Sequence, residues 1–171
     1  EGNWLPPEQN SIKHPMYFGC NSFVDYEIGR VLDAADKYAE DALVIFTSDH
    51  GTPLHTHGLT SKGPAMYDET TRIPFIVRWR GQTPEGAVCS DPISHINVVP
   101  TLLDAAGLSV PPFIEGQSTL NTFMDPDEKP NDRIFMEFSR YEVNHDGWGG
   151  FQPIRSVFNG KYKLVINLHY K

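Results

Sequence analysis

The stretch ALVIFTSDHGTPLHTHGLTSKGPAMYDETTRIPFIVRW, residues 42–79, decides the fold of this chain. It opens with a continuous apolar run, 42–46, which leads through two small polar residues to the tripeptide Asp-His-Gly at 49–51. A short run rich in Val, Ile and Phe that ends in this way is typical of a buried parallel strand. A second candidate strand, 73–79, closes the stretch. We therefore expect two strands joined by a loop that carries polar chemistry.

The loop that begins at Asp49 is rich in side chains that bind metals and anions. Because ligands in open α/β sheets bind beyond the carboxyl ends of the strands, we expect Asp49 and His50 to face a cleft there. A carboxylate suits Ca²⁺ or Mg²⁺, whereas an imidazole nitrogen is more usual for Zn²⁺ or Mn²⁺, so these residues alone leave the metal open. The competing interpretations are a helix or turn cap for Asp49 and a packed imidazole for His50. We expect His55, further along the loop, to be structural or exposed.

The rest of the chain indicates an α/β fold that ends in a small antiparallel sheet. We expect residues 1–127 to form part of a mostly parallel sheet flanked by helices, and residues 128–171 to begin a small C-terminal antiparallel subdomain. The expected elements are a helix capped by Asn21 or Ser22, a helix over 94–107, a strand over 133–138, and a hairpin of 154–158 with 161–167 around Asn159-Gly160.

Charge and hydropathy argue against two classes of partner. The 171 residues include 22 acidic and 14 basic side chains, a net charge of −8, whereas a general nucleic-acid binder needs a basic face. No apolar run approaches the roughly 20 residues of a membrane-spanning helix, so we expect no membrane partner. Cys20 and Cys89 lack metal-site or redox spacing, and we interpret them as two separate buried thiols rather than a disulfide.

Several segments together resemble a known enzyme family. VIFTSDHG, SKG and MYDETTRIPFIVRWRG resemble the second half of the sulfatase family, which lies within the alkaline-phosphatase-like superfamily. FVDYEIGRVLDAADKY is similar to the helix that precedes them in the family, and IRSVFNGKYKLVIN resembles a strand pair of its C-terminal subdomain. ISHINVVPTLLDAAGL resembles a later helix, with Asn97 where the family often has Asp. The segment RYEVNHDGWGGFQPIR narrows the resemblance to bacterial choline-sulfatase-like and YidJ-type sulfatases.

The resemblance implies a metal-dependent sulfatase, a sulfuric ester hydrolase that acts on a small sulfated substrate. It favours Ca²⁺ as the metal, with Asp49 and His50 as ligands. It also implies that Lys62, thirteen residues after Asp49 (62 − 49), binds the sulfate group and takes part in catalysis. The three N–H donors of an ammonium group suit a tetrahedral anion. The competing interpretation is an ordinary solvated lysine.

Two histidines complete the expected site. His57 is expected to take a catalytic part, by orienting the loop, reaching the substrate or helping to protonate the leaving group, and its alternative is an ordinary loop histidine. His145 lies in an aromatic, Gly-rich loop of the kind that lines substrate sites, so it is expected to bind substrate. The alternative for this loop is packing against the main sheet.

The chain also lacks two features of the family's active site. The family's nucleophile is a formylglycine made from Cys or Ser in a Cys/Ser-x-Pro-x-Arg motif, and neither Cys20 nor Cys89 fits that motif. The family's first Asp-Asp metal ligands are missing too. We therefore expect a fragment that carries half of an active site. The missing N-terminal portion of the enzyme would supply the formylglycine, and the 171 residues alone would be inactive.

Other functions remain open at this stage. A phosphodiester or phosphonate monoester hydrolase of the same superfamily shares the Asp-His pair and the Lys spacing. A non-catalytic module that binds a metal or an anion is the alternative outside enzymes. The resemblance points to a bacterial protein and leaves the cytoplasm and the periplasm open as its compartment.

Overall fold

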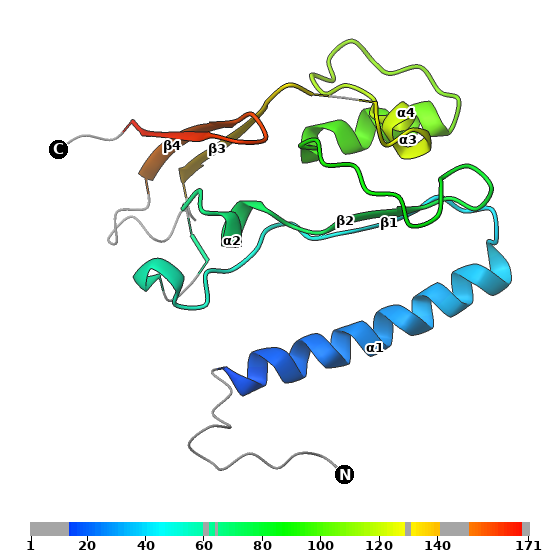
Figure 1. Ribbon diagram of the computed structural model, residues 1–171, viewed down its shortest axis with the longest axis horizontal. Coiled ribbons are helices and arrows are strands. Elements are labelled where there is room, and N and C mark those ends of the chain that lie inside the picture. Colours follow the sequence, from blue (N-terminus) through cyan, green and yellow to red (C-terminus); the bar gives the residue numbers. More distant parts are fainter. Residues whose placement is uncertain (1–13, 60–61, 64, 129–130, 141–150, 169–171) are drawn as a thin grey trace. The chain divides into compact units, whose positions relative to one another are not determined.

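A computed structural model describes residues 14–59, 62–63, 65–128, 131–140 and 151–168 (Figure 1). Contacts within the chain divide it into two units, Glu1–Ala42 and Leu43–Lys171. The boundary between residues 127 and 128 that the sequence suggests stays a prediction. Within the described part of the chain, no helix is both long and apolar enough to cross a membrane.

The first unit contains the long helix α1 (Pro15–Tyr38). Proline suits the first turn because its fixed φ matches the helix and its missing N–H needs no partner there. His14 precedes it in the left-handed region, with φ 60°. The expected start at Asn21 or Ser22 is wrong, because both residues lie inside the helix. Their side chains donate to backbone carbonyls four residues earlier, over 2.9 and 3.1 Å, instead of capping free N–H groups.

The two cysteines are free thiols. The expectation of two separate residues is therefore confirmed. Their expected burial is wrong, since Cys20 is exposed and Cys89 is half-buried. Cys20 lies on α1, which buries none of its own residues.

The second unit begins with strand β1 (Val44–Thr47), which pairs with β2 (Phe75–Arg78). The pair is antiparallel, with Val44 opposite Arg78 and Thr47 opposite Phe75. No parallel pairing occurs among the described residues, so the mostly parallel sheet stays a prediction. A parallel connection requires a crossover of a dozen or more residues, usually a helix. The segment between β1 and β2 instead contains two short helical turns, η1 (Thr56–Gly58) and α2 (Asp68–Thr71), and returns the chain in the opposite direction. Both strands are half-buried or exposed rather than fully buried.

The helix expected over 94–107 is confirmed, although it begins as a 3-10 turn. The turn η2 (His95–Asn97) runs directly into α3 (Val98–Ala105). Gly107 ends the helix with φ 69°, a conformation that glycine adopts at little cost. The Leu108 N–H then bonds to the carbonyl of Leu103 over 2.9 Å, which satisfies a carbonyl of the last turn.

Buried polar residues join α3 to the segment before α4 (Leu120–Met124). The Thr101 hydroxyl donates to the carbonyl of Asn97 over 2.6 Å and accepts the N–H of Thr119 over 2.9 Å. The Asn97 side-chain oxygen accepts the N–H of Gln117 over 3.2 Å. Asn97, Thr101 and Thr119 are all buried. Asn97 therefore has a structural partner in this chain.

The C-terminal antiparallel sheet is confirmed. Its strands β3 (Ile134–Arg140), β4 (Phe151–Phe158) and β5 (Lys163–Asn167) pair in that order, and both pairings are antiparallel. The β4–β5 hairpin is two residues longer at its turn than expected, because Phe158 pairs with Lys163. The Asn159 side chain accepts the N–H groups of Lys161 and Tyr162 over 3.1 and 2.8 Å, which extends the turn to residues 159–162.

Candidate active site

Asp49, His50 and Gly51 follow the carboxyl end of β1, as the sequence predicts, and their backbone is fixed by α2. The Gly51 N–H donates to the carbonyl of Thr70 over 2.9 Å. A Cβ added to Gly51 would lie 2.0 Å from the carbonyl oxygen of Glu69. Only glycine allows this close approach of two backbone segments. The turn that carries Asp49 and His50 therefore depends on α2 for its position.

Hydrogen bonds orient the Asp49 and His50 side chains toward each other. The His50 N–H donates to Asp49 Oδ1 over 2.8 Å, and His50 Nδ1 lies 2.8 Å from the carbonyl oxygen of Gly51. Because a carbonyl only accepts, Nδ1 carries the proton in this bond. Nε2 of a neutral ring is then an acceptor, and it lies 3.4 Å from Asp49 Oδ2. Two acceptors that face each other in this way fit a shared cation.

The electrostatics of the turn keep Asp49 ionised. The backbone N–H of His50 is the main cause that lowers the pKa of the Asp49 carboxyl below its usual value, and slight desolvation works in the opposite direction. The charge of His50, when it is protonated, and the Ser48 hydroxyl lower this pKa further. A carboxylate that stays charged at neutral pH is the form that binds a metal.

Asp49 and His50 share a cavity of about 550 Å³ with Lys62. A cavity of this size is in the range of small-molecule sites. Its wall also includes His95 and Glu137 among the polar residues, and apolar residues that include Met66, Ile73, Ile93 and Phe138. The structure therefore brings together three of the predicted site residues. Among the described residues, no group of three or more His, Cys, Asp or Glu side chains could hold a metal ion, and the role of Asp49 and His50 as metal ligands stays a prediction.

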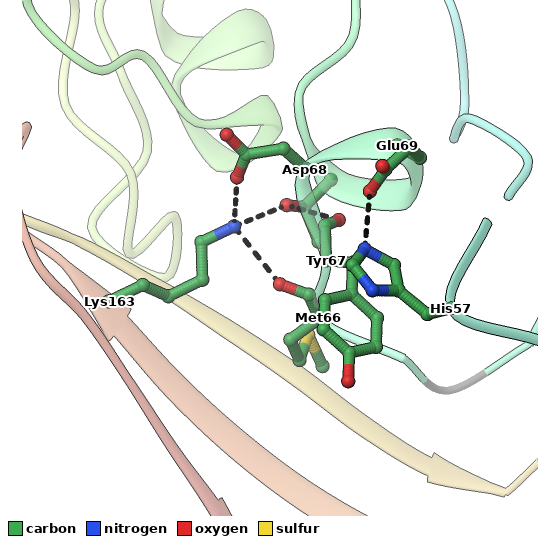
Figure 2. A network of polar contacts seen from close by, with 7 residues as sticks. His57, Met66, Tyr67, Asp68, Glu69 and Lys163 are labelled. Carbon is green, nitrogen blue, oxygen red and sulfur yellow. Dashed lines mark hydrogen bonds and ion pairs between the residues drawn. The ribbon is translucent and has the colours of Figure 1, made fainter.

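His57 is placed differently from the other three. It does not line the cavity that holds Lys62. Its ring stacks on Tyr67, with centroids 3.8 Å apart and planes at 12°, and its Nε2 lies 3.5 Å from Glu69 Oε2 (Figure 2). The backbone of His57 has φ 57°, an uncommon conformation that these side-chain contacts help to hold. Its catalytic role stays a prediction.

The two remaining histidines of the sequence analysis have simple outcomes. His55 is exposed, as expected, and its N–H donates to the carbonyl of Leu59 over 2.9 Å. His145 lies outside the described residues, so its part in substrate binding stays a prediction.

Sequence reasoning missed two residues near the site. His95 lines the cavity, and its Nε2 lies 3.4 Å from the hydroxyl of Thr47 at the end of β1. A histidine at the first turn of a helix that follows a strand is a signal that could have found it. Lys163 at the start of β5 bonds to the α2 segment, as Figure 2 shows. No local pattern marks Lys163, because its partners lie more than 90 residues earlier.

The close approach at Gly51 leads to a testable prediction. Gly51→Ala should destabilise the full-length protein by about 1–3 kcal/mol, the usual cost of overpacking, because the new Cβ meets a backbone carbonyl that cannot rotate away. Thermal unfolding measures the effect. The matched control is Gly63→Ala, since a Cβ at Gly63 meets no atom within 4 Å. Equal melting temperatures for the two variants would contradict this packing.

Comparison with known proteins assigns the family. The family model described as Sulfatase matches residues 7–108. The chain is 42% identical over 158 residues to the uncharacterized sulfatase YidJ of Escherichia coli K12, covering 91% of this chain and 30% of YidJ. It is 28% identical over 154 residues to the choline-sulfatase of Rhizobium meliloti, covering 87% of this chain and 28% of that enzyme. The chain thus spans less than a third of the length of these relatives.

Solved structures agree with this assignment. The structure of BT4656 in complex with its substrate D-glucosamine-2-N,6-O-disulfate matches with a TM-score of 0.73 and 28% identity, over 83% of this chain and 29% of that one. A phosphonate monoester hydrolase from Silicibacter pomeroyi matches with a TM-score of 0.64 and 24% identity, over 85% of this chain and 32% of that one. The second likeness concerns the fold alone.

The fold and the family model place the chain in the alkaline-phosphatase-like superfamily. Within that superfamily, the chain belongs to the sulfatase family. The family resemblance found in the sequence is therefore confirmed.

Proposed function

We propose that the full-length protein is a metal-dependent sulfuric ester hydrolase and that this chain supplies one wall of its active site. The observation that carries the proposal is the shared cavity of Asp49, His50 and Lys62. Asp49 and His50 follow a single apolar strand, and Lys62 lies in the loop that comes after them. Membership of the sulfatase family supports sulfate ester hydrolysis over other reactions that the scaffold allows.

The residues fit a divalent cation. His50 Nδ1 is held by the Gly51 carbonyl, which leaves Nε2 as an acceptor 3.4 Å from the Asp49 carboxylate. Metal-binding histidines usually donate their other N–H to such a carbonyl, which fixes the tautomer. We propose Ca²⁺ as the ion, with Asp49 and His50 as two of its ligands. When bound, the cation offsets negative charge on the sulfate oxygens and on the attacking group.

Lys62 is proposed to bind the sulfate group directly. Lys62 lines the cavity that Asp49 and His50 also line, and an ammonium group suits a tetrahedral anion because it carries three N–H donors. A bond to a charged group contributes roughly 1.5–3 kcal/mol when it is formed. If that bond strengthens as charge moves to the leaving oxygen, it lowers the barrier rather than only the dissociation constant. The nucleophile, an expected formylglycine, belongs to a motif that this sequence does not contain.

The proposal is tested by substrate comparison. We expect the purified full-length protein to hydrolyse an aryl sulfate with a higher kcat/KM than the matching aryl phosphate diester or phenylphosphonate monoester. The same assays are run after chelation and after Ca²⁺ is restored. A preference for the phosphonate ester would favour the phosphonate hydrolase alternative. Ca²⁺ binding without turnover of any ester would favour a non-catalytic binding module.

A further inference from the structure

The side chain of Lys163 makes three hydrogen bonds to the segment around α2. Its Nζ lies 3.0 Å from the carbonyl of Met66 and 2.5 Å from Asp68 Oδ1 (Figure 2). It also lies 3.0 Å from the hydroxyl of Thr71. An ammonium has three donors, and each of them has a partner here. The side chain is 17% exposed, whereas most lysines extend into solvent. The Lys163 contacts therefore join β5 to both ends of α2.

The α2 segment needs such an anchor. A helix of only four residues has little stability of its own, because the cost of its first turn is not recovered by further turns. Lys163 reaches the residue before the helix cap, the first helical residue and the last one. The Lys163 hydrogen bond is the main cause that lowers the pKa of the Asp68 carboxyl, so Asp68 stays charged and the ion pair persists at neutral pH.

From α2 the contacts continue to the candidate cation site. The Thr70 carbonyl accepts the N–H of Gly51 over 2.9 Å. Gly51 also packs against the backbone of Glu69 so closely that no side chain fits between them. On its other side, the Gly51 carbonyl holds His50 Nδ1 at 2.8 Å. Gly51 is therefore fixed by α2 through its N–H and fixes the His50 ring through its carbonyl.

We infer that Lys163 is a positioning residue for the Asp49–His50 cation site, acting through α2 and Gly51; this inference rests on the proposed function. Lys163 touches neither Asp49 nor His50. Instead, it sets the place of the backbone that orients the His50 ring. Outer partners of metal ligands commonly change metal affinity by roughly 10–100-fold when they are removed.

The test uses the full-length protein and three variants. Lys163→Met keeps most of the side-chain length and removes the donors, whereas Lys163→Arg keeps a charge and donors. The control is Lys161→Met, which changes a neighbouring lysine whose Nζ lies over the Tyr162 ring at 5.3 Å. Calorimetric titration gives the Ca²⁺ dissociation constant. Hydrogen exchange at the Gly51 amide reports the bond to Thr70 without any metal.

We expect Lys163→Met to weaken Ca²⁺ binding by about 10-fold or more and to speed exchange at the Gly51 amide. Lys163→Arg should recover part of both losses, and Lys161→Met should match the wild type. If Lys163→Met does not fold, Asp68→Asn weakens the same contact more gently and should change both readouts in the same direction.

Two results would overturn the inference in ways that differ from failure of the proposed function. Unchanged Ca²⁺ affinity and unchanged Gly51 exchange in Lys163→Met would mean that Lys163 does not position the cation site. A lower melting temperature in the same variant would then show a contribution to stability only. A wild-type protein that binds no Ca²⁺ would instead overturn the proposed cation site. In that case the Gly51 exchange rate still decides whether Lys163 holds this backbone.

Discussion

Asp49→Asn is expected to lower sulfate ester hydrolysis by the full-length protein by more than roughly 100-fold, the upper end of what changes to outer partners of a metal cost. The substitution keeps the shape of the side chain but removes its charge and one acceptor oxygen. A neutral amide beside His50 Nε2 attracts a divalent cation far less than the carboxylate whose pKa the His50 N–H already lowers. Steady-state kinetics over a range of Ca²⁺ concentrations measures the loss.

The dependence of activity on Ca²⁺ concentration distinguishes a metal-ligand role of Asp49 from a turn-capping role. For a metal ligand, high Ca²⁺ should restore part of the activity of Asp49→Asn, and the dissociation constant for Ca²⁺ should rise with it. The matched control is Asp127→Asn, the same change at an exposed position outside the cavity, which should behave as the wild type. If Asp49→Asn lost stability but kept the wild-type Ca²⁺ dependence, Asp49 would be a turn cap.

Lys62→Ala is expected to lower kcat and kcat/KM together, by an order of magnitude or more for a lost bond of roughly 2 kcal/mol. The reason is that a charge which binds the sulfate group more strongly in the transition state contributes to both parameters. Loss of an interaction that is equal in the ground state would instead raise KM alone. Steady-state kinetics on an aryl sulfate separates the two cases.

Folding controls make the Lys62 result specific. The melting temperature of Lys62→Ala should stay close to that of the wild type, since surface substitutions usually change stability by less than about 0.5 kcal/mol. Lys161→Ala, at a lysine in the β4–β5 turn outside the Lys62 cavity, should leave the kinetics unchanged. Unchanged kinetics in Lys62→Ala would show that Lys62 is an ordinary solvated lysine. Loss of the cooperative thermal unfolding transition would show that Lys62 is a structural residue.

Local patterns predicted most of the elements and the C-terminal hairpin, but not how β1 and β2 pair. The hairpin around Asn159-Gly160 and the helix that ends at Gly107 follow from turn and cap chemistry that acts within a few residues. The direction of β1 relative to β2 does not, because an apolar run looks the same in either kind of sheet. The start of α1 was misplaced because Asn21 can cap a helix or bond within one, and Pro15 was the stronger signal.

In the candidate site, too, residues close together in the sequence are predictable and distant ones are not. Asp49, His50 and Lys62 come from one strand and its loop, so their closeness in sequence indicates a shared polar loop, and the family resemblance adds the role expected of Lys62. His95 and Lys163 reach the region from distant parts of the sequence. His95 has only the weak signal of its place at a helix start, and Lys163 has no neighbour pattern that distinguishes it from an ordinary surface side chain. Only the tertiary structure brings them to the cavity wall and to α2.

The Lys163 contact also has a consequence for the order in which this unit folds. Its three bonds close loops of 92 to 97 residues, whereas paired residues of β1 and β2 are 28 to 34 apart (75 − 47 and 78 − 44). Longer loops cost more chain entropy to close, by about (3/2)RT ln n, so we expect the short-range pairings to form first. We therefore expect the Lys163 bonds to form after the rate-limiting step, so that their loss mainly speeds unfolding. The contact that we propose to orient the His50 turn would thus slow the unfolding of the native state and leave the folding rate almost unchanged.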